Sequence, residues 1–173
     1  MNNAEKGAIE PAGKVWPTPK PYNDDPDAPE AQFMDRKDWT PGMVRFHDYL
    51  CWVAMELLGI ACLKVRYPLG MNATACYGRK SAASGVIDFN VGALGICWFD
   101  AIDTEQDELV IHEIAHHRAG NHYSEEFNKA CCEVGAGLKR LAVEQPERMA
   151  GFMAAAMTAA VVGSSVGEEG VQS

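Results

Sequence analysis

The sequence has little that favours binding to a polyanion or insertion into a membrane. Lysine and arginine number 15 against 24 aspartate and glutamate residues, which gives a formal net charge of −9. This balance disfavours proteins that hold nucleic acid or anionic lipid by charge. Residues 149–167 carry no charge, but they are mainly Ala, Gly, Ser and Thr, which are too weakly apolar for a typical bilayer span. We therefore expect no direct contact with nucleic acid and no membrane-spanning segment.

The chain also lacks cysteine pairs at the spacing of metal or redox motifs. Its six cysteines include no Cys-x-x-Cys, and its first residues lack the basic and apolar regions of a secretory signal. A chain of 173 residues can bury a hydrophobic core without disulfides. These features predict a cytoplasmic protein whose cysteines are buried free thiols, with Cys131 and Cys132 half-buried on a helix.

Proline is scarce beyond the N-terminal part, and its distribution predicts the domain organisation. Seven of the nine prolines lie within the first 41 residues, which favours an extended, disordered arm over residues 1–40. Such an arm either has no role or docks onto a partner protein. Residues 41–162 are the expected single domain, followed by a flexible tail over 163–173. An Ala- and Met-rich helix near the C-terminus leaves a homo-oligomer as an open alternative.

Periodicity and turn residues predict one long helix followed by three short strands. Thr40 and Pro41 form a typical helix start, and apolar residues recur at steps of three and four up to residue 58. Short alternating stretches predict strands over residues 60–66, 73–79 and 85–91. In the last strand one face carries Ile87, Phe89 and Val91, and the polar-containing face carries Val86, Asp88 and Asn90. This alternation is typical of a half-buried strand.

The C-terminal half is predicted to be helical. Asp103 is a good N-cap, Gln106 occupies the reciprocal capping position, and the helix is expected to run to about Ala119. Gly120 is expected to end it by adopting a left-handed backbone conformation. Ser124 caps a further helix over residues 125–143, and Pro146 opens another.

Four of the five histidines fall in a span of eleven residues, in the sequence IHEIAHHRAGNH over residues 111–122. This span begins on the first of these helices. His112 and His116 stand four residues apart, so on a helix their imidazoles lie on one face and can bind one ion. Glu113 then lies beside the ion, where its carboxylate can take a proton from a metal-bound water. The pattern His-Glu-x-x-His therefore predicts a catalytic Zn²⁺ site.

A catalytic zinc usually has three protein ligands and one open position. His122 follows His112 by ten residues, just after a glycine that can turn the chain, and is the expected third ligand. Glu126 and Glu133, on the following helix, are the alternatives. His117 points off the ligand face and is interpreted as a solvated residue or one that supports a ligand.

Residues 111–122 resemble the active-site helix of the zincin metallopeptidases, and the spacing of the three histidines is that of the metzincin and Spartan-like groups. The segment from Phe89 to Phe99 is similar to small uncharacterised zincin-like domains of bacteria and phages. The glycine of the metzincin pattern stands at Gly120 rather than at position 119, and no Met-turn can be assigned, so the resemblance is to zincins in general.

The resemblance implies an α+β fold: a small twisted mixed sheet whose edge strand lines the cleft, an active-site helix and a helical C-terminal part. It implies zinc bound by His112, His116 and His122, and Glu113 as general base. Tyr123, next to the third ligand, is a candidate donor to the developing oxyanion, or else a packed aromatic residue.

Two functions are therefore expected. The first is a zinc metallopeptidase that hydrolyses protein or peptide substrates. The second is a catalytically silent, zinc-stabilised binding module of a phage or bacterium, in which the proline-rich arm recruits a partner. Proteolysis of DNA-bound proteins, as in Spartan-like enzymes, needs a basic patch that the chain does not supply.

Overall fold

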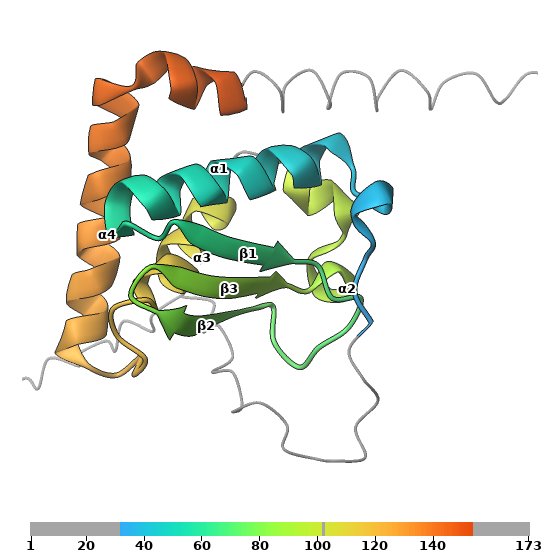
Figure 1. The fold of residues 1–173 in the computed structure, drawn as a ribbon, viewed down its shortest axis with the longest axis horizontal. Helices are drawn as coiled ribbons and strands as arrows, with labels where there is room; N and C mark the ends of the chain where they lie inside the picture. Colours follow the sequence, from blue (N-terminus) through green and yellow to red (C-terminus); the bar gives the residue numbers. More distant parts are fainter. Residues whose placement is uncertain (1–31, 102, 154–173) are drawn as a thin grey trace, which may run out of the picture.

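The computed structural model describes residues 32–101 and 103–153 of the chain. Helices flank a small mixed sheet, so the α+β class is confirmed (Figure 1). The elements, in chain order, are η1 (Arg36–Asp38), α1 (Pro41–Leu58), β1 (Cys62–Arg66), β2 (Ala75–Ser81), β3 (Ser84–Phe89), α2 (Val91–Leu94), η2 (Ile96–Asp100), α3 (Thr104–Ala115) and α4 (Glu125–Glu144). Residues 146–153 are helical as well.

The three strands are arranged in the order β1-β3-β2, so β3 is central. β1 pairs with β3 in parallel, with Val65 opposite Ile87. β2 pairs with β3 antiparallel, with Tyr77 opposite Ile87, and a register irregularity lies between Arg79 and Ser81. Two residues, Ala82 and Ala83, connect β2 to β3. β2 is therefore an edge strand, and it contacts helix α3.

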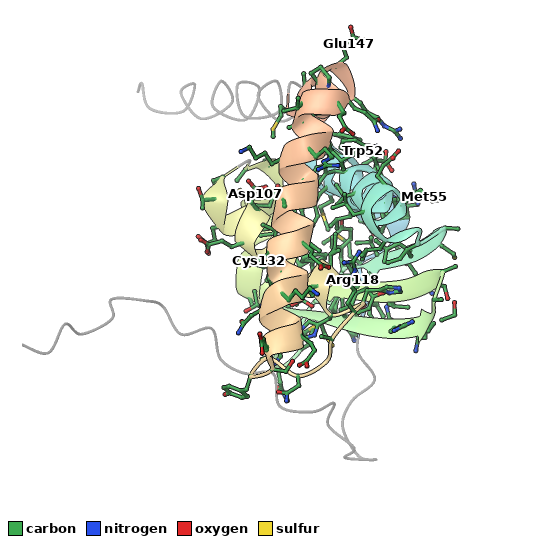
Figure 2. The ribbon with its side chains drawn as sticks, turned by 90° about the vertical axis from the view of Figure 1, so that its left-hand side faces the viewer. Trp52, Met55, Asp107, Arg118, Cys132 and Glu147 are labelled. Atoms are coloured by element: carbon green, nitrogen blue, oxygen red, sulfur yellow. The ribbon has the colours of Figure 1, made fainter. Side chains whose placement is uncertain are left out.

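The helices surround the sheet on several sides. α1 lies along β1, α3 lies behind the strands, and α4 stands across one end of the assembly (Figure 1). Figure 2 views the molecule with α4 in front, with Asp107 of α3 on one side of it and Met55 of α1 on the other. α3 contacts both β2 and α4. This arrangement holds the histidine-bearing helix between the sheet edge and α4.

A single main core joins these layers. Phe46 of α1 packs edge-to-face against Phe89 of β3 and Phe99 of η2. Further buried side chains come from α3 and α4, among them Val110, Ile114, Val134 and Leu141. Apolar packing against this core thus fixes α3 and removes apolar surface from water.

The half-buried pattern predicted for residues 85–91 is wrong for the second half of the strand. Ile87 and Phe89 are buried as predicted, but Asp88 and Asn90 on the other face are also buried. Asp88 accepts two hydrogen bonds of 2.6 Å from the Arg66 guanidinium, and Asn90 donates to the carbonyls of Met71 and Ala73. These bonds pair the Asp88 carboxylate and the Asn90 amide nitrogen, although Asn90 Oδ1 has no hydrogen-bond partner among the described residues. Alternation of polarity therefore did not predict exposure here.

The predicted end of the histidine-bearing helix is also wrong. α3 ends at Ala115, with His116 as C-cap, rather than near Ala119. Among the described residues the glycines with positive φ are Gly59 and Gly95, so Gly120 does not adopt the left-handed conformation. Asp103 caps α3 as predicted, but the Gln106 side chain donates to the Trp98 carbonyl at 3.1 Å rather than back to the cap.

The cysteines are free, as predicted, but not buried. Cys62, Cys97 and Cys132 are exposed and the other three are partly exposed. Half-burial of Cys131 on a helix is confirmed, whereas Cys132 lies on the exposed side of α4. Burial of the thiols is therefore absent at three positions and partial at the other three, of which Cys51 and Cys131 pack against hydrophobic clusters.

The ends of the chain are described only in part. Residues 32–40, within the expected arm, contact the domain: the Met34 amide donates to the Tyr67 carbonyl and the Leu69 amide to the Gln32 carbonyl, both at 2.8 Å. The predictions for residues 1–31 and 154–173, including the flexible tail, lie outside the described residues. Within residues 32–101 and 103–153, no helix combines the length and apolar character of a membrane span.

Candidate metal centre

His112, His116 and His122 come together where α3 ends and the chain turns towards α4. Each offers one imidazole nitrogen, and these nitrogens all lie within 4.8 Å of one another. The Nε2 atoms of His112 and His122 are 3.0 Å apart. Two nitrogens bound to one ion at about 2.0–2.1 Å with tetrahedral angles would be about 3.3 Å apart. The three histidines are therefore placed to hold a metal ion after small side-chain movements.

Local structure brings the three rings to one point. His112 lies in the last turn of α3 and His116 caps that helix, so helical spacing places both on one face. A turn over residues 116–118 then reverses the chain, and Ser124 starts α4 by accepting a hydrogen bond from the Phe127 amide at 3.1 Å. The short connection between the two helices carries His122 back towards α3.

Phe127, on the first turn of α4, contacts all three histidines. Its ring centroid lies 5.1 Å from that of His112, 4.7 Å from that of His116 and 5.0 Å from that of His122. Phe127 is itself buried, in a small cluster with Ala115 and Ala130. It forms an apolar base that fixes the imidazoles from one side.

The imidazoles of His112 and His116 are held in the neutral form, which binds metals. Burial, together with the neighbouring His116 and His122, lowers the pKa of His112 to about 4. Burial likewise lowers the pKa of His116. His116 Nδ1 lies 3.2 Å from the Ala119 carbonyl, to which only a protonated nitrogen can donate. The Nε2 lone pair of His116 is therefore left for a ligand, as in many metal sites.

The carboxyl group of Glu113 lies against the edge strand β2. Glu113 is 3% exposed, and the backbone of Tyr77 in β2 hydrogen-bonds its carboxyl group. Its other oxygen, Oε2, is buried with no hydrogen-bond partner among the described residues. Burial raises the pKa of Glu113 to about 8, and the hydrogen bond from Tyr77 acts in the opposite direction. A buried carboxylate oxygen without a partner is costly and calls for a water or another ligand.

The remaining candidate residues are not part of the group. Among the described residues, the cluster able to hold an ion consists of the three histidines and includes neither Glu126 nor Glu133. Glu126 is exposed, and Glu133 forms an ion pair with Arg118, which lies beside α4 (Figure 2). Tyr123 follows His122 directly, with 84% of its surface exposed, and its backbone amide donates to the Asn121 side chain at 3.0 Å.

His117 lies off the ligand face, as predicted, but it is not solvated. It is 6% exposed, and its ring nitrogens lie 2.5 Å from the Tyr77 hydroxyl and 3.1 Å from the Ala82 carbonyl. Burial lowers its pKa. Tyr77 and Phe127 were not recognised from the sequence, because their contacts to the histidines are made between separate elements and leave no spacing pattern.

Comparisons with protein-family models, curated proteins and solved structures found no match for this chain. The candidate site is therefore defined by its own geometry: three convergent histidines, an apolar base formed by Phe127, and a buried carboxyl group on the same helix.

Proposed function

We propose that the protein is a zinc-dependent metallopeptidase with a zincin-like fold. The observation that carries this proposal is the convergence of His112, His116 and His122 at the end of α3, the helix that also holds Glu113, whose buried Oε2 has no partner among the described residues. Three imidazole nitrogens suit Zn²⁺, which accepts nitrogen ligands in a tetrahedral arrangement and keeps one position open in catalytic sites. A bound zinc would supply a water molecule acidic enough to ionise near neutral pH and would polarise a carbonyl group.

The chain's own residues would provide the remaining chemistry. His112, His116 and His122 hold the ion, and the hydrogen bond from His116 to Ala119 fixes the orientation of its ring. Glu113 Oε2 receives a proton from the water that attacks the peptide carbonyl and then delivers it to the leaving amine. Water addition and proton return break the C–N bond, leaving a carboxylic acid and an amine.

Tyr123 is proposed as the residue that hydrogen-bonds the developing oxyanion. Its position next to His122 and its high exposure leave the phenol accessible from solvent. A phenolic O–H aimed at the new negative charge stabilises it more strongly than the ground-state carbonyl. A protein or peptide substrate and a cytoplasmic location complete the proposal.

Replacing Glu113 tests the mechanism directly. The Glu113→Gln variant keeps the size of the side chain and removes its ability to act as a base, so we expect zinc binding to persist while peptide cleavage falls by at least about 100-fold. Cleavage of a peptide library by the zinc-loaded protein measures this, with metal content determined on the same samples. Glu108→Gln is the matched control, since Glu108 is an exposed residue of α3. Cleavage by Glu113→Gln at the wild-type rate would contradict the mechanism.

The burial of Glu113 favours one competing function, a zinc-stabilised binding module without catalysis. Only 3% of Glu113 is exposed, and such a residue can serve to anchor α3 to β2 rather than to activate water. Under this alternative the wild-type protein cleaves no peptide, Glu113→Gln leaves partner binding intact, and removal of residues 1–31 abolishes it.

A further inference from the structure

His117 fastens the end of α3 to the β2–β3 hairpin. Its Nε2 lies 3.1 Å from the Ala82 carbonyl, which can only accept, so the proton is on Nε2. In the neutral ring Nδ1 is then an acceptor and the Tyr77 hydroxyl donates to it, with 2.5 Å between the two atoms. Arg79 adds a third link by donating to the His117 carbonyl at 3.2 Å. One residue thus holds the strand, the turn and the helix end together.

The same strand holds the carboxyl group of Glu113. The backbone N–H of Tyr77 hydrogen-bonds Glu113, so it points away from β3 and towards α3. The side chain of Tyr77 is bound to His117 while its backbone is bound to Glu113. Tyr77 therefore contacts both the His117 ring and the Glu113 carboxyl group.

Gly85 of β3 leaves the space that the phenol of Tyr77 occupies. A Cβ atom at this position would collide with the hydroxyl oxygen and with the ring carbons beside it. Gly85 has no positive φ, so its backbone does not require glycine. Because Gly85 has no side chain, the Tyr77 side chain can extend past β3 and reach His117.

We propose that Tyr77 and His117 form a clamp that sets the position of the Glu113 carboxyl group, and that both act as positioning residues for the proposed hydrolysis. This inference rests on the proposed function for its catalytic part. Neither residue belongs to the histidine group that could hold the ion. The clamp acts through one hydrogen bond, from the Tyr77 amide to Glu113, and that bond can be observed separately from catalysis.

The test compares three variants of the full-length, zinc-loaded protein. Tyr77→Phe removes the hydroxyl and keeps the ring. His117→Leu removes both hydrogen bonds at similar volume, whereas His117→Gln keeps one donor and one acceptor for Ala82 and Tyr77. His47→Gln, on α1, is the matched control for a histidine-to-glutamine change. The measurements are hydrogen exchange of individual amides by NMR, zinc content, kcat and KM.

We expect the Tyr77 amide to exchange at least about tenfold faster in Tyr77→Phe and His117→Leu, while the Ile87 amide in the central strand is unchanged. In the same variants kcat falls by about 10- to 100-fold with KM within about twofold and zinc content unchanged. His117→Gln recovers part of both effects. A purely structural role would instead accelerate exchange throughout the sheet.

The clamp is overturned if Tyr77 exchange stays at the wild-type rate in Tyr77→Phe and His117→Leu, or if faster exchange leaves kcat unchanged. If the wild-type protein cleaves no peptide, the proposed hydrolysis fails, and amide exchange alone then decides whether the clamp exists. If His117→Leu does not fold, Tyr77→Phe decides, because it retains the packing of the ring.

Discussion

His112 and His116 are the residues whose arrangement is most predictable from sequence. Helix geometry places residues four apart on one face, and the structure confirms that both lie beside His122. The clamp contact between Tyr77 and His117 joins residues that are 40 positions apart. No local sequence pattern predicts such a contact. Sequence spacing therefore gives the proposed ligands, whereas the groups that orient Glu113 depend on the tertiary packing of β2 against α3.

Removing His122 tests the choice of third ligand. Loss of a hydrogen bond that supports a ligand typically weakens metal binding by about 10- to 100-fold. We expect the loss of a ligand in His122→Ala to weaken zinc binding by more than this. Zinc titration calorimetry measures this, with Glu126→Ala as control because Glu126 lies outside the histidine group. Unchanged affinity in His122→Ala, with loss of affinity in Glu126→Ala, would move the third ligand to α4.

At the scale of elements, the helix starts and the ends of α1 and α4 were predicted to within one residue, whereas the end of α3 was not. Thr40, Asp103 and Ser124 each accept a hydrogen bond from the backbone amide three residues later, which is the interaction that favours such residues at N-caps. The end of α3 follows a different rule. The helix ends in a turn that needs no glycine. In this turn the backbone amide of His117 donates to the Ile114 carbonyl and that of Arg118 donates to the Ala115 carbonyl.

The N-cap of α3 should contribute measurably to stability. Asp103 accepts from the Gln106 amide at 2.9 Å, and loss of such a cap typically costs about 1 kcal/mol. We expect Asp103→Ala to lower the free energy of unfolding by about this amount in urea denaturation. Glu105→Gln, an exposed change in the same turn, should have a much smaller effect. Equal stability of Asp103→Ala and wild type would show that the cap is dispensable.

At the scale of the molecule, the sequence predicted a mixed α+β domain with three strands, but not their order. The positions of the strands follow from local alternation, while the parallel pairing of β1 with β3 and the edge position of β2 depend on long-range packing. The packing of α4 across α3 also places Phe127 under the histidines. The fold thus completes a candidate site of which the sequence predicts only the proposed ligands and the carboxyl group.

The central claim is that His112, His116 and His122 bind one zinc ion. Elemental mass spectrometry of the protein, purified without a histidine tag and without added metal, measures this most directly. We predict about one zinc per chain, held in a site of three protein ligands. A protein that contains no metal, and still takes up none when zinc is offered, would contradict the account and remove the basis for the peptidase.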